Sequence, residues 1–467
     1  MNFSYTNESL VFIYNLLQSN EYFDPSIFDH LNSSELVDLV HIHINEYSFE
    51  TGHLILNFAL KRYPDESQFA DLKIQTFILE KKYQPALIFL NSTLSNTLGY
   101  FDHQIITAEL LLNMGKFKEA KSILNFMKSQ TDEQESTILY QKGMVYLKEE
   151  SRYLAEEKFK EAILLWPENQ LAQHELGKIL QKENRFEVNF NFFEEILEHN
   201  AFAYQIWFFK GKVHLLRGET DMALECFDFS YLSCEKFTPA IEAKLNLYLE
   251  LNKYEHALEE LILIIENFDP TVEHYLKTAT CFNNLGKEDK AMQILQFALE
   301  LFPDEEELFY QLAKLEVKSG HHLKALDFIH QSLVLNGELE DSHLLAADIY
   351  QALDNTVMAI NHLNESIALD DINHKAWVKL ISIYLENGET EKCLEYIAKA
   401  RLSVYHPEVE LFNSLILFEM GQRSEAFTIL NDIIEEDLKT AEKIFKLNPL
   451  LREDTEINAL FQIYQPL

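Results

Sequence analysis

Large apolar residues recur along most of this chain at spacings of three, four and seven, and a compact residue recurs with them about every 34 positions. The recurring compact positions are Gly52, Ala86, Ala120, Ala155, Asn189, Ala223, Ala257, Ala291, Ala325, Ala359, Cys393 and Ala426. Consecutive members of this set are 33 to 35 residues apart. Such a period indicates that one structural unit has been copied end to end.

Each unit predicts two amphipathic helices. When the compact residue is numbered as position 20 of its unit, large apolar residues commonly occupy positions 4, 11, 17 and 24. In the unit that begins at Ser136 three of these residues are Leu139, Tyr146 and Phe159. Because neighbours on one helix face are three, four or seven residues apart, the pattern gives each helix one apolar stripe. A small side chain at position 20 allows the two helices to cross closely.

Glycine and proline positions support this two-helix unit. Six of the 12 glycines fall at position 15, where the first helix ends and a positive φ is expected: Gly115, Gly218, Gly286, Gly320, Gly388 and Gly421. Gly143, Gly177 and Gly211 fall at position 8, where we expect a close helix contact. Prolines recur near position 32, where the second helix must stop.

The segment LYQKGMVYLKEESRYLAEEKFKEAILLWP, residues 139–167, resembles the consensus of the tetratricopeptide repeat family. The resemblance covers twelve units, from residue 33 to about residue 440. It implies an all-α fold, a right-handed superhelix or solenoid of about twelve helix-turn-helix repeats. It also implies a scaffold that binds a partner protein or peptide in its concave groove.

The two ends of the chain depart from the repeat. The predicted division is an N-terminal helical cap at 1–32, divergent repeats 1–3 at 33–135, repeats 4–12 at 136–440 and capping helices at 441–467. The first cap rests on one apolar stretch, Leu10–Leu17, and the last predicted helix has Asp454 or Thr455 as its N-cap. An extra residue falls beside the polar run at 129–136, where we expect a flexible joint.

Asn189 is the one longer, polar residue among the compact positions. A buried amide without hydrogen-bond partners costs about 1 to 3 kcal/mol. One interpretation is a loosened or hydrogen-bonded helix crossing. The other is a bend that opens the groove between repeats four and six.

Charge narrows the range of partners. The chain has 76 acidic and 39 basic residues, a net charge of −37, and residues 238–467 contribute −23 of it. Nucleic acids and anionic membranes need a basic surface, so we expect neither as a partner. No apolar run reaches the ~18 residues of a membrane helix, and the N-terminus lacks the basic region of a signal peptide. The four cysteines contain no CxxC pair, which favours a soluble protein of the reducing cytoplasm.

Groove residues follow from the family resemblance, in which positions 2, 5, 9, 12 and 13 of each first helix are expected to face the groove. The candidate partner-binding residues are Tyr140, Lys148, His174, Lys178, Lys182, Phe208 and Lys212 in repeats 4–6, and Tyr310, Lys314 and Lys318 in repeat 9. A basic, aromatic groove inside an acidic molecule suggests an acidic peptide segment or a C-terminal carboxylate as the ligand. Alternatively, these lysines only balance neighbouring glutamates on a solvated face.

Motifs for catalysis are missing from the sequence. There is no HExxH, GxSxG, P-loop or glycine-rich nucleotide fingerprint. His41 and His43 would point to different faces of a helix. Because repeats and caps account for the whole chain, we expect a non-catalytic protein without cofactor or metal. Two alternatives to a plain scaffold remain open: a regulator gated by a bound peptide, and an assembly factor that self-associates.

Overall fold

The computed structural model describes residues 25–92 and 99–464, which form helices joined by turns, with no β-strand among them. The chain divides into two compact units, Met1–Lys244 and Leu245–Leu467, and the boundary lies inside helix α14 (Thr238–Glu250). The predicted apolar stretch Leu10–Leu17 lies outside the described residues.

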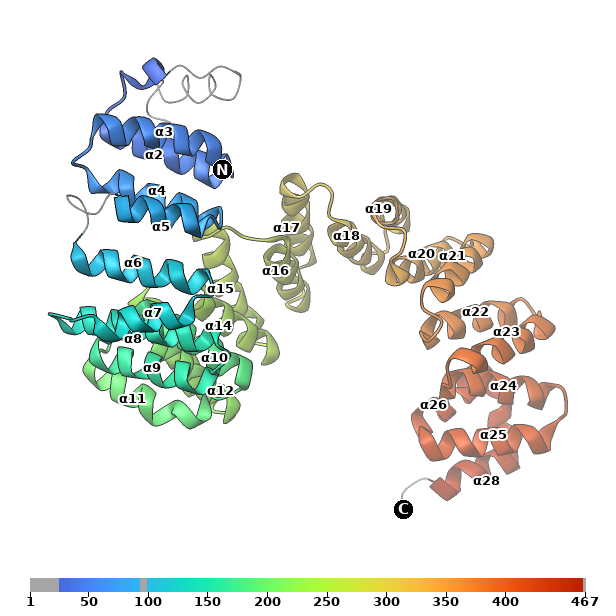
Figure 1. Cartoon of the computed structure of the whole chain (residues 1–467). Helices are drawn as coiled ribbons and strands as arrows, with labels where there is room; N and C mark the ends of the chain where they lie inside the picture. The colour runs from blue at the N-terminus through green and yellow to red at the C-terminus, as the bar shows by residue number, and fades with distance from the viewer. Residues whose placement is uncertain (1–24, 93–98, 465–467) are drawn as a thin grey trace. The chain divides into compact units, whose positions relative to one another are not determined.

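Six helix pairs precede α14 in the N-terminal unit, and in five of them the two helices lie side by side (Figure 1). The helices are α2 (Ser33–Asn45), α3 (Phe49–Arg62), α4 (Ser67–Leu79), α5 (Tyr83–Ser92), α6 (Tyr100–Asn113), α7 (Phe117–Phe126), α8 (Asp132–Lys148), α9 (Arg152–Leu165), α10 (Gln170–Glu183), α11 (Phe190–His199), α12 (Tyr204–Leu216) and α13 (Thr220–Ser233). Short 3₁₀ turns, η1 (Pro25–Phe28) and η2 (Glu187–Asn189), precede α2 and α11.

The C-terminal unit continues the same alternation. Its helices are α15 (Tyr254–Asn267), α16 (Val272–Asn284), α17 (Glu288–Leu301), α18 (Glu306–Lys318), α19 (His322–Leu335), α20 (Glu340–Ala352), α21 (Thr356–Leu369), α22 (His374–Glu386), α23 (Thr390–Ser403), α24 (Pro407–Glu419), α25 (Arg423–Glu436), α26 (Leu438–Glu442), α27 (Ile444–Leu447) and α28 (Thr455–Tyr464), with η3 (Pro449–Glu453) before α28. Ten of the twelve first helices begin at position 1 of their repeat. The all-α solenoid of helix-turn-helix repeats is therefore confirmed.

The core of each pair forms around position 20. All twelve position-20 residues are buried, and ten of them have no exposed surface. Large side chains one turn further along the second helix are buried as well, as Phe159 and Phe227 are in repeats 4 and 6. In ten repeats the two helices of the pair also pack closely against each other, as predicted, whereas α10 and α11, the pair with Asn189, do not.

Position 15 adopts the left-handed conformation in all twelve repeats. Six of these residues are the predicted glycines, with φ between 69° and 78°. The other six carry side chains and have φ between 51° and 62°: Tyr47, Lys81, Glu150, Asn184, Asn252 and Asp354. In each case the next residue's N–H bonds to the carbonyl five residues earlier, as Ser151 N does to Tyr146 O at 2.9 Å. The turn geometry is therefore fixed by the helix pair, even where a side chain strains it.

The predicted flexible joint at 129–136 is wrong for its second half, because residues 132–136 form the first turn of α8. Thr131 caps this helix, and its hydroxyl accepts the N–H of Gln134 at 3.2 Å. Asp132, Glu133 and Glu135 lie in the first turn, where carboxylates interact favourably with the helix dipole. A polar, acidic run is as suitable for a helix start as for a loop.

Both described ends of the chain cover apolar surface. Phe28 and Leu31, before α2, are buried in the core of the first helix pair. At the other end Ile457 and Phe461 of α28 pack into one cluster with residues of α24 and α25. Asp454 is the N-cap of α28, since its carboxylate accepts the N–H groups of the second and third residues that follow it.

The strained turns provide a test of stability. Glu150→Gly should raise the free energy of unfolding by about 1 kcal/mol, because glycine removes the left-handed strain at a solvent-exposed side chain. Lys148→Gly, two residues earlier inside α8, is the control and should lower stability by about 1 kcal/mol. Urea unfolding followed by circular dichroism measures both. Equal destabilisation by the two substitutions would contradict the assigned strain.

Candidate functional site

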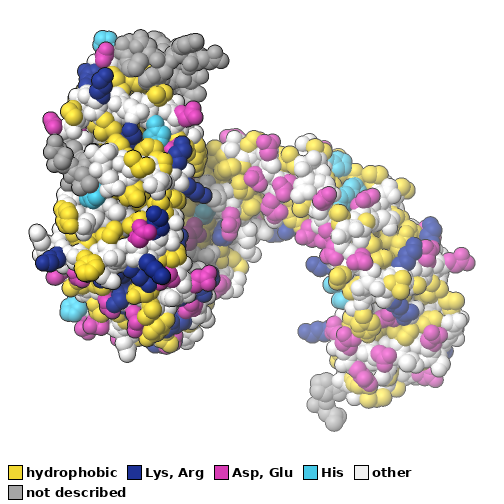
Figure 2. All heavy atoms as spheres, viewed as in Figure 1, with side chains coloured by type: hydrophobic (Ala, Val, Ile, Leu, Met, Phe, Trp, Pro, Cys, Tyr) yellow, Lys and Arg dark blue, Asp and Glu magenta, His cyan; other side chains and the backbone are white. Residues whose placement is uncertain are grey.

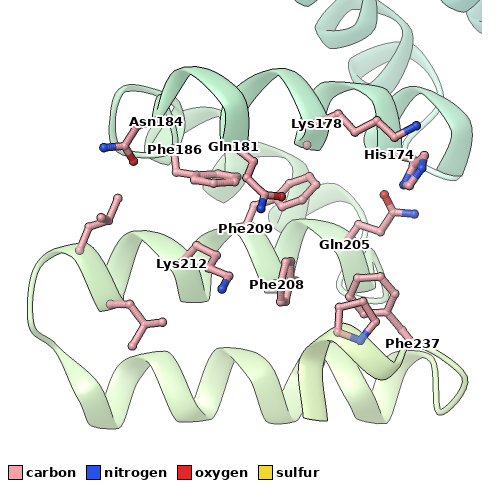
Figure 3. Close-up of a pocket in the computed structure, with 14 residues that line it drawn as sticks. His174, Lys178, Gln181, Asn184, Phe186, Gln205, Phe208, Phe209, Lys212 and Phe237 are labelled. Atoms are coloured by element: carbon pink, nitrogen blue, oxygen red, sulfur yellow. The ribbon is translucent and has the colours of Figure 1, made fainter. Parts of the chain in front are cut away.

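A cavity of about 600 Å³ lies between the first helices of repeats 5 and 6, α10 and α12. In Figure 3 the side chains of His174, Lys178 and Gln181 on α10 lie across the cavity from Phe208 and Lys212 on α12. Its remaining lining residues are Gly177, Asn184, Phe186, Gln205, Phe209, Leu215, Leu216, Phe237 and Pro239. The volume is in the range of pockets that bind small ligands or single side chains.

Gly177 positions the aromatic wall of this cavity. A Cβ atom at Gly177 would lie 2.4 Å from Cζ of Phe209, so this ring occupies the space that a side chain would take. The Phe209 ring is held by Phe186 and Phe193, with ring centroids 5.7 and 5.8 Å away. The predicted close contact at position 8 is therefore present, and here it joins the first helices of two successive repeats.

Asn189 alters the second helix of the same repeat. The residue is buried and ends the 3₁₀ turn η2, so that α11 begins only at Phe190. Its side-chain amide donates a hydrogen bond to the carbonyl of Arg185 at 2.8 Å. The structure thus agrees with the first of the two interpretations, a locally loosened crossing in which the amide of Asn189 is hydrogen-bonded. Phe186, just before this turn, contributes to the cavity.

Four predicted groove residues meet in this cavity: His174, Lys178, Phe208 and Lys212. The ammonium of Lys178 forms an ion pair with Glu175 at 2.8 Å, so part of the positive charge is balanced locally. Lys212 lies over the ring of Phe208, with its Nζ 5.2 Å from the ring centroid. The cavity therefore has an aromatic floor and a polar rim that includes two cations.

The other predicted residues lie elsewhere. Tyr140 packs on Phe159 in repeat 4, and burial, with smaller contributions from nearby glutamates, raises the pKa of Tyr140 to about 12. Lys148 and Lys182 are exposed and do not line the cavity. Phe186 and Phe237, which also line the cavity, were not predicted, because they lie in connecting segments outside the first helices.

The three predicted residues of repeat 9 do not line the cavity between α10 and α12. Tyr310, Lys314 and Lys318 all lie on α18 in the C-terminal unit. Lys314 Nζ lies 5.2 Å from the Tyr310 ring centroid, and burial raises the pKa of Tyr310 to about 12. Lys318 forms an ion pair with Glu288 at 2.8 Å. Like the pair of Lys178 with Glu175, this ion pair balances part of the lysine charge locally.

A second cavity in the N-terminal unit has the opposite charge. It has a volume of about 740 Å³, lies between α4 and α6, and includes Asp71, Asp102 and Glu109 in its lining. Burial raises the pKa of Asp71 and of Glu109, and the charge of Asp102 adds to the effect on Asp71. On the face shown in Figure 2, acidic and basic side chains are intermixed over both units. The charged residues that line the two cavities thus differ in sign.

Buried cysteines serve as compact apolar residues. All four cysteines are free, and Cys226, Cys281 and Cys393 are buried. Burial raises the pKa of each of these three thiols to about 11. A thiol with so high a pKa is a poor nucleophile at neutral pH.

Comparisons with known proteins agree with the repeat. A family model described as tetratricopeptide repeat matches residues 275–305. A TPR repeat-containing protein of Methanocaldococcus jannaschii is 24% identical over 382 residues, which are 78% of this chain and 61% of the relative. A component of eukaryotic translation initiation factor 3 from Arabidopsis thaliana is 23% identical over 201 residues, 39% of this chain and 43% of that protein. The chain thus spans less than two thirds of either relative.

Among solved structures, a tetratricopeptide repeat protein from Parabacteroides merdae is 19% identical. The similarity covers 54% of this chain and 99% of that chain, with a TM-score of 0.34. The matching family model thus shows a tetratricopeptide repeat at residues 275–305, and the helix pairs and the repeat period of the other described residues are similar to it. Proteins built on this repeat act in general as scaffolds for binding other proteins. None of the described helices is long and apolar enough to cross a membrane.

The close contact at Gly177 generates a prediction. Gly177→Ala should lower the free energy of unfolding by about 1 to 3 kcal/mol, because the added methyl group overlaps the buried Phe209 ring. Gly337→Ala is the matched control, since Gly337 is exposed and has no left-handed φ. Urea unfolding of the two variants checks the difference. A Gly177→Ala variant as stable as the control would show that the contact is not a constraint.

Proposed function

We propose that this protein is a non-catalytic interaction scaffold whose cavity between α10 and α12 binds an extended segment of a partner protein. In this proposal one aromatic or long aliphatic side chain of the partner enters the cavity, and a nearby carboxylate of the partner pairs with Lys178 or Lys212. The observation that supports it is the combination of an aromatic floor with cations at the rim.

The aromatic floor favours an apolar side chain. Phe208 is held between Phe227 and Phe237, with ring centroids 5.6 and 5.4 Å away. Because these rings are fixed by one another, binding an apolar group there requires little reorganisation. Apolar area removed from water stabilises the complex by about 25 cal/mol per Å² before the entropic costs of association.

Charge at the rim favours a carboxylate over an ammonium group. A partner carboxylate would compete with Glu175 for the ammonium of Lys178, and charge-assisted hydrogen bonds of this kind are stronger than neutral ones. The equivalent groove segment at α4 and α6 is acidic and would repel the same carboxylate. In this proposal the two cavities differ in charge, so an extended partner with an acidic and a basic end would bind along them in one orientation.

Peptide binding tests the proposal. Fluorescence anisotropy would be measured for labelled peptides that contain one Phe, Leu or Trp followed by Asp or Glu within four residues, and for the same peptides with Lys in place of the acid. The acidic peptides should bind more tightly, and Lys178→Gln should weaken them about tenfold, which corresponds to about 1.4 kcal/mol.

Two further variants provide the controls. Lys182→Gln, on the same helix but outside the cavity, should change the affinity less than twofold. Gln181→Trp should abolish binding, because a large ring at this exposed lining residue fills the cavity without disturbing the core. Equal binding by acidic and basic peptides, or undiminished binding to Gln181→Trp, would contradict the proposal.

A further inference from the structure

Two histidines one repeat apart meet in the C-terminal unit, at the starts of successive first helices. His374 is the first residue of α22, and His406 is the N-cap of α24. Their imidazole rings are stacked, with centroids 3.6 Å apart and planes 6° from parallel. Glu408, the second residue of α24, lies beside them, and the donor atoms of all three residues lie within 4.8 Å of one another.

We propose that His374, His406 and Glu408 form a binding site for one divalent transition-metal ion such as Zn²⁺. Two imidazole nitrogens and one carboxylate oxygen are a donor set that suits zinc, and three protein ligands leave one position for water. The three residues are half-buried, so an ion can reach them from solvent. The site lies in the C-terminal unit and does not depend on the cavity at α10 and α12.

Metal binding would have to displace two existing interactions. Lys443 forms an ion pair with Glu408, and Nδ1 of His406 accepts the backbone N–H of Glu408 at 3.2 Å. The Lys443 side chain is 47% exposed, so its ammonium can move into water at little cost. Because a metal binds in the plane of an imidazole, the two rings must also turn out of their stack. Lys443 therefore competes with the metal, and removing its charge should strengthen binding.

A second histidine pair provides a matched control. His343 and His362 are in direct contact, with Nδ1 atoms 3.0 Å apart. No third His, Cys, Asp or Glu donor completes a cluster around this pair in the part of the chain that the structure describes. Proximity of two imidazoles is thus common to both pairs, while the carboxylate donor is specific to the proposed site.

Equilibrium dialysis of the full chain, without an affinity tag and after treatment with a chelator, would test the site with ZnCl₂ at pH 7.5. We expect one zinc ion to bind per chain. His374→Ala and Glu408→Gln should each lower the affinity for zinc at least about tenfold, since even residues that only hold a metal ligand in place contribute 10- to 100-fold. His343→Ala should bind zinc like the unaltered chain. Lys443→Met should bind it more tightly.

Circular dichroism would establish that each variant is folded. Because Lys443→Met removes no metal ligand, this variant tests the site even if a histidine variant unfolds. Absence of zinc binding at millimolar concentration would overturn the proposal. So would equal losses in His374→Ala and His343→Ala, or an unchanged affinity in Lys443→Met.

Discussion

Close approach of two helices at position 20 is the constraint on which the rest of the structure depends. Where a compact side chain occupies the crossing, the two helices of the pair can pack closely against each other. Positions 8, 15 and 20 are thereby committed to the fold. Groove positions remain free to vary, and equivalent ones have opposite charge: position 9 is Glu109 in repeat 3 but Lys178 and Lys212 in repeats 5 and 6.

Most of the fold could be predicted because its constraints act on residue types. Small residues at the crossing and glycine at the turn are direct consequences of close packing and positive φ. The turns at Lys81 and Glu150 could not be recognised, because a whole helix pair imposes that conformation on an unfavourable residue. The polar run before Ser136 was misinterpreted, since its composition fits a loop as well as a capped helix start.

Site residues were predictable only where the repeat determines their direction. Phe208 and Lys212 follow from their helix positions, whereas Phe186 and Phe237 reach the cavity from connecting segments. Those segments depend on the hydrogen-bonded turn at Asn189 and on loop geometry, which have no period. The histidine pair did have a signal, because His374 and His406 occupy nearly the same place in successive repeats. The contact between these two rings could be recognised from the sequence only by aligning adjacent repeats.

The left-handed turn residues are unevenly distributed between the two units. Side chains occupy this position in four of six turns of the N-terminal unit and in two of six of the C-terminal unit. Each makes its helix pair less stable than glycine would. This turn position alone therefore stores more backbone strain in the N-terminal unit than in the C-terminal unit.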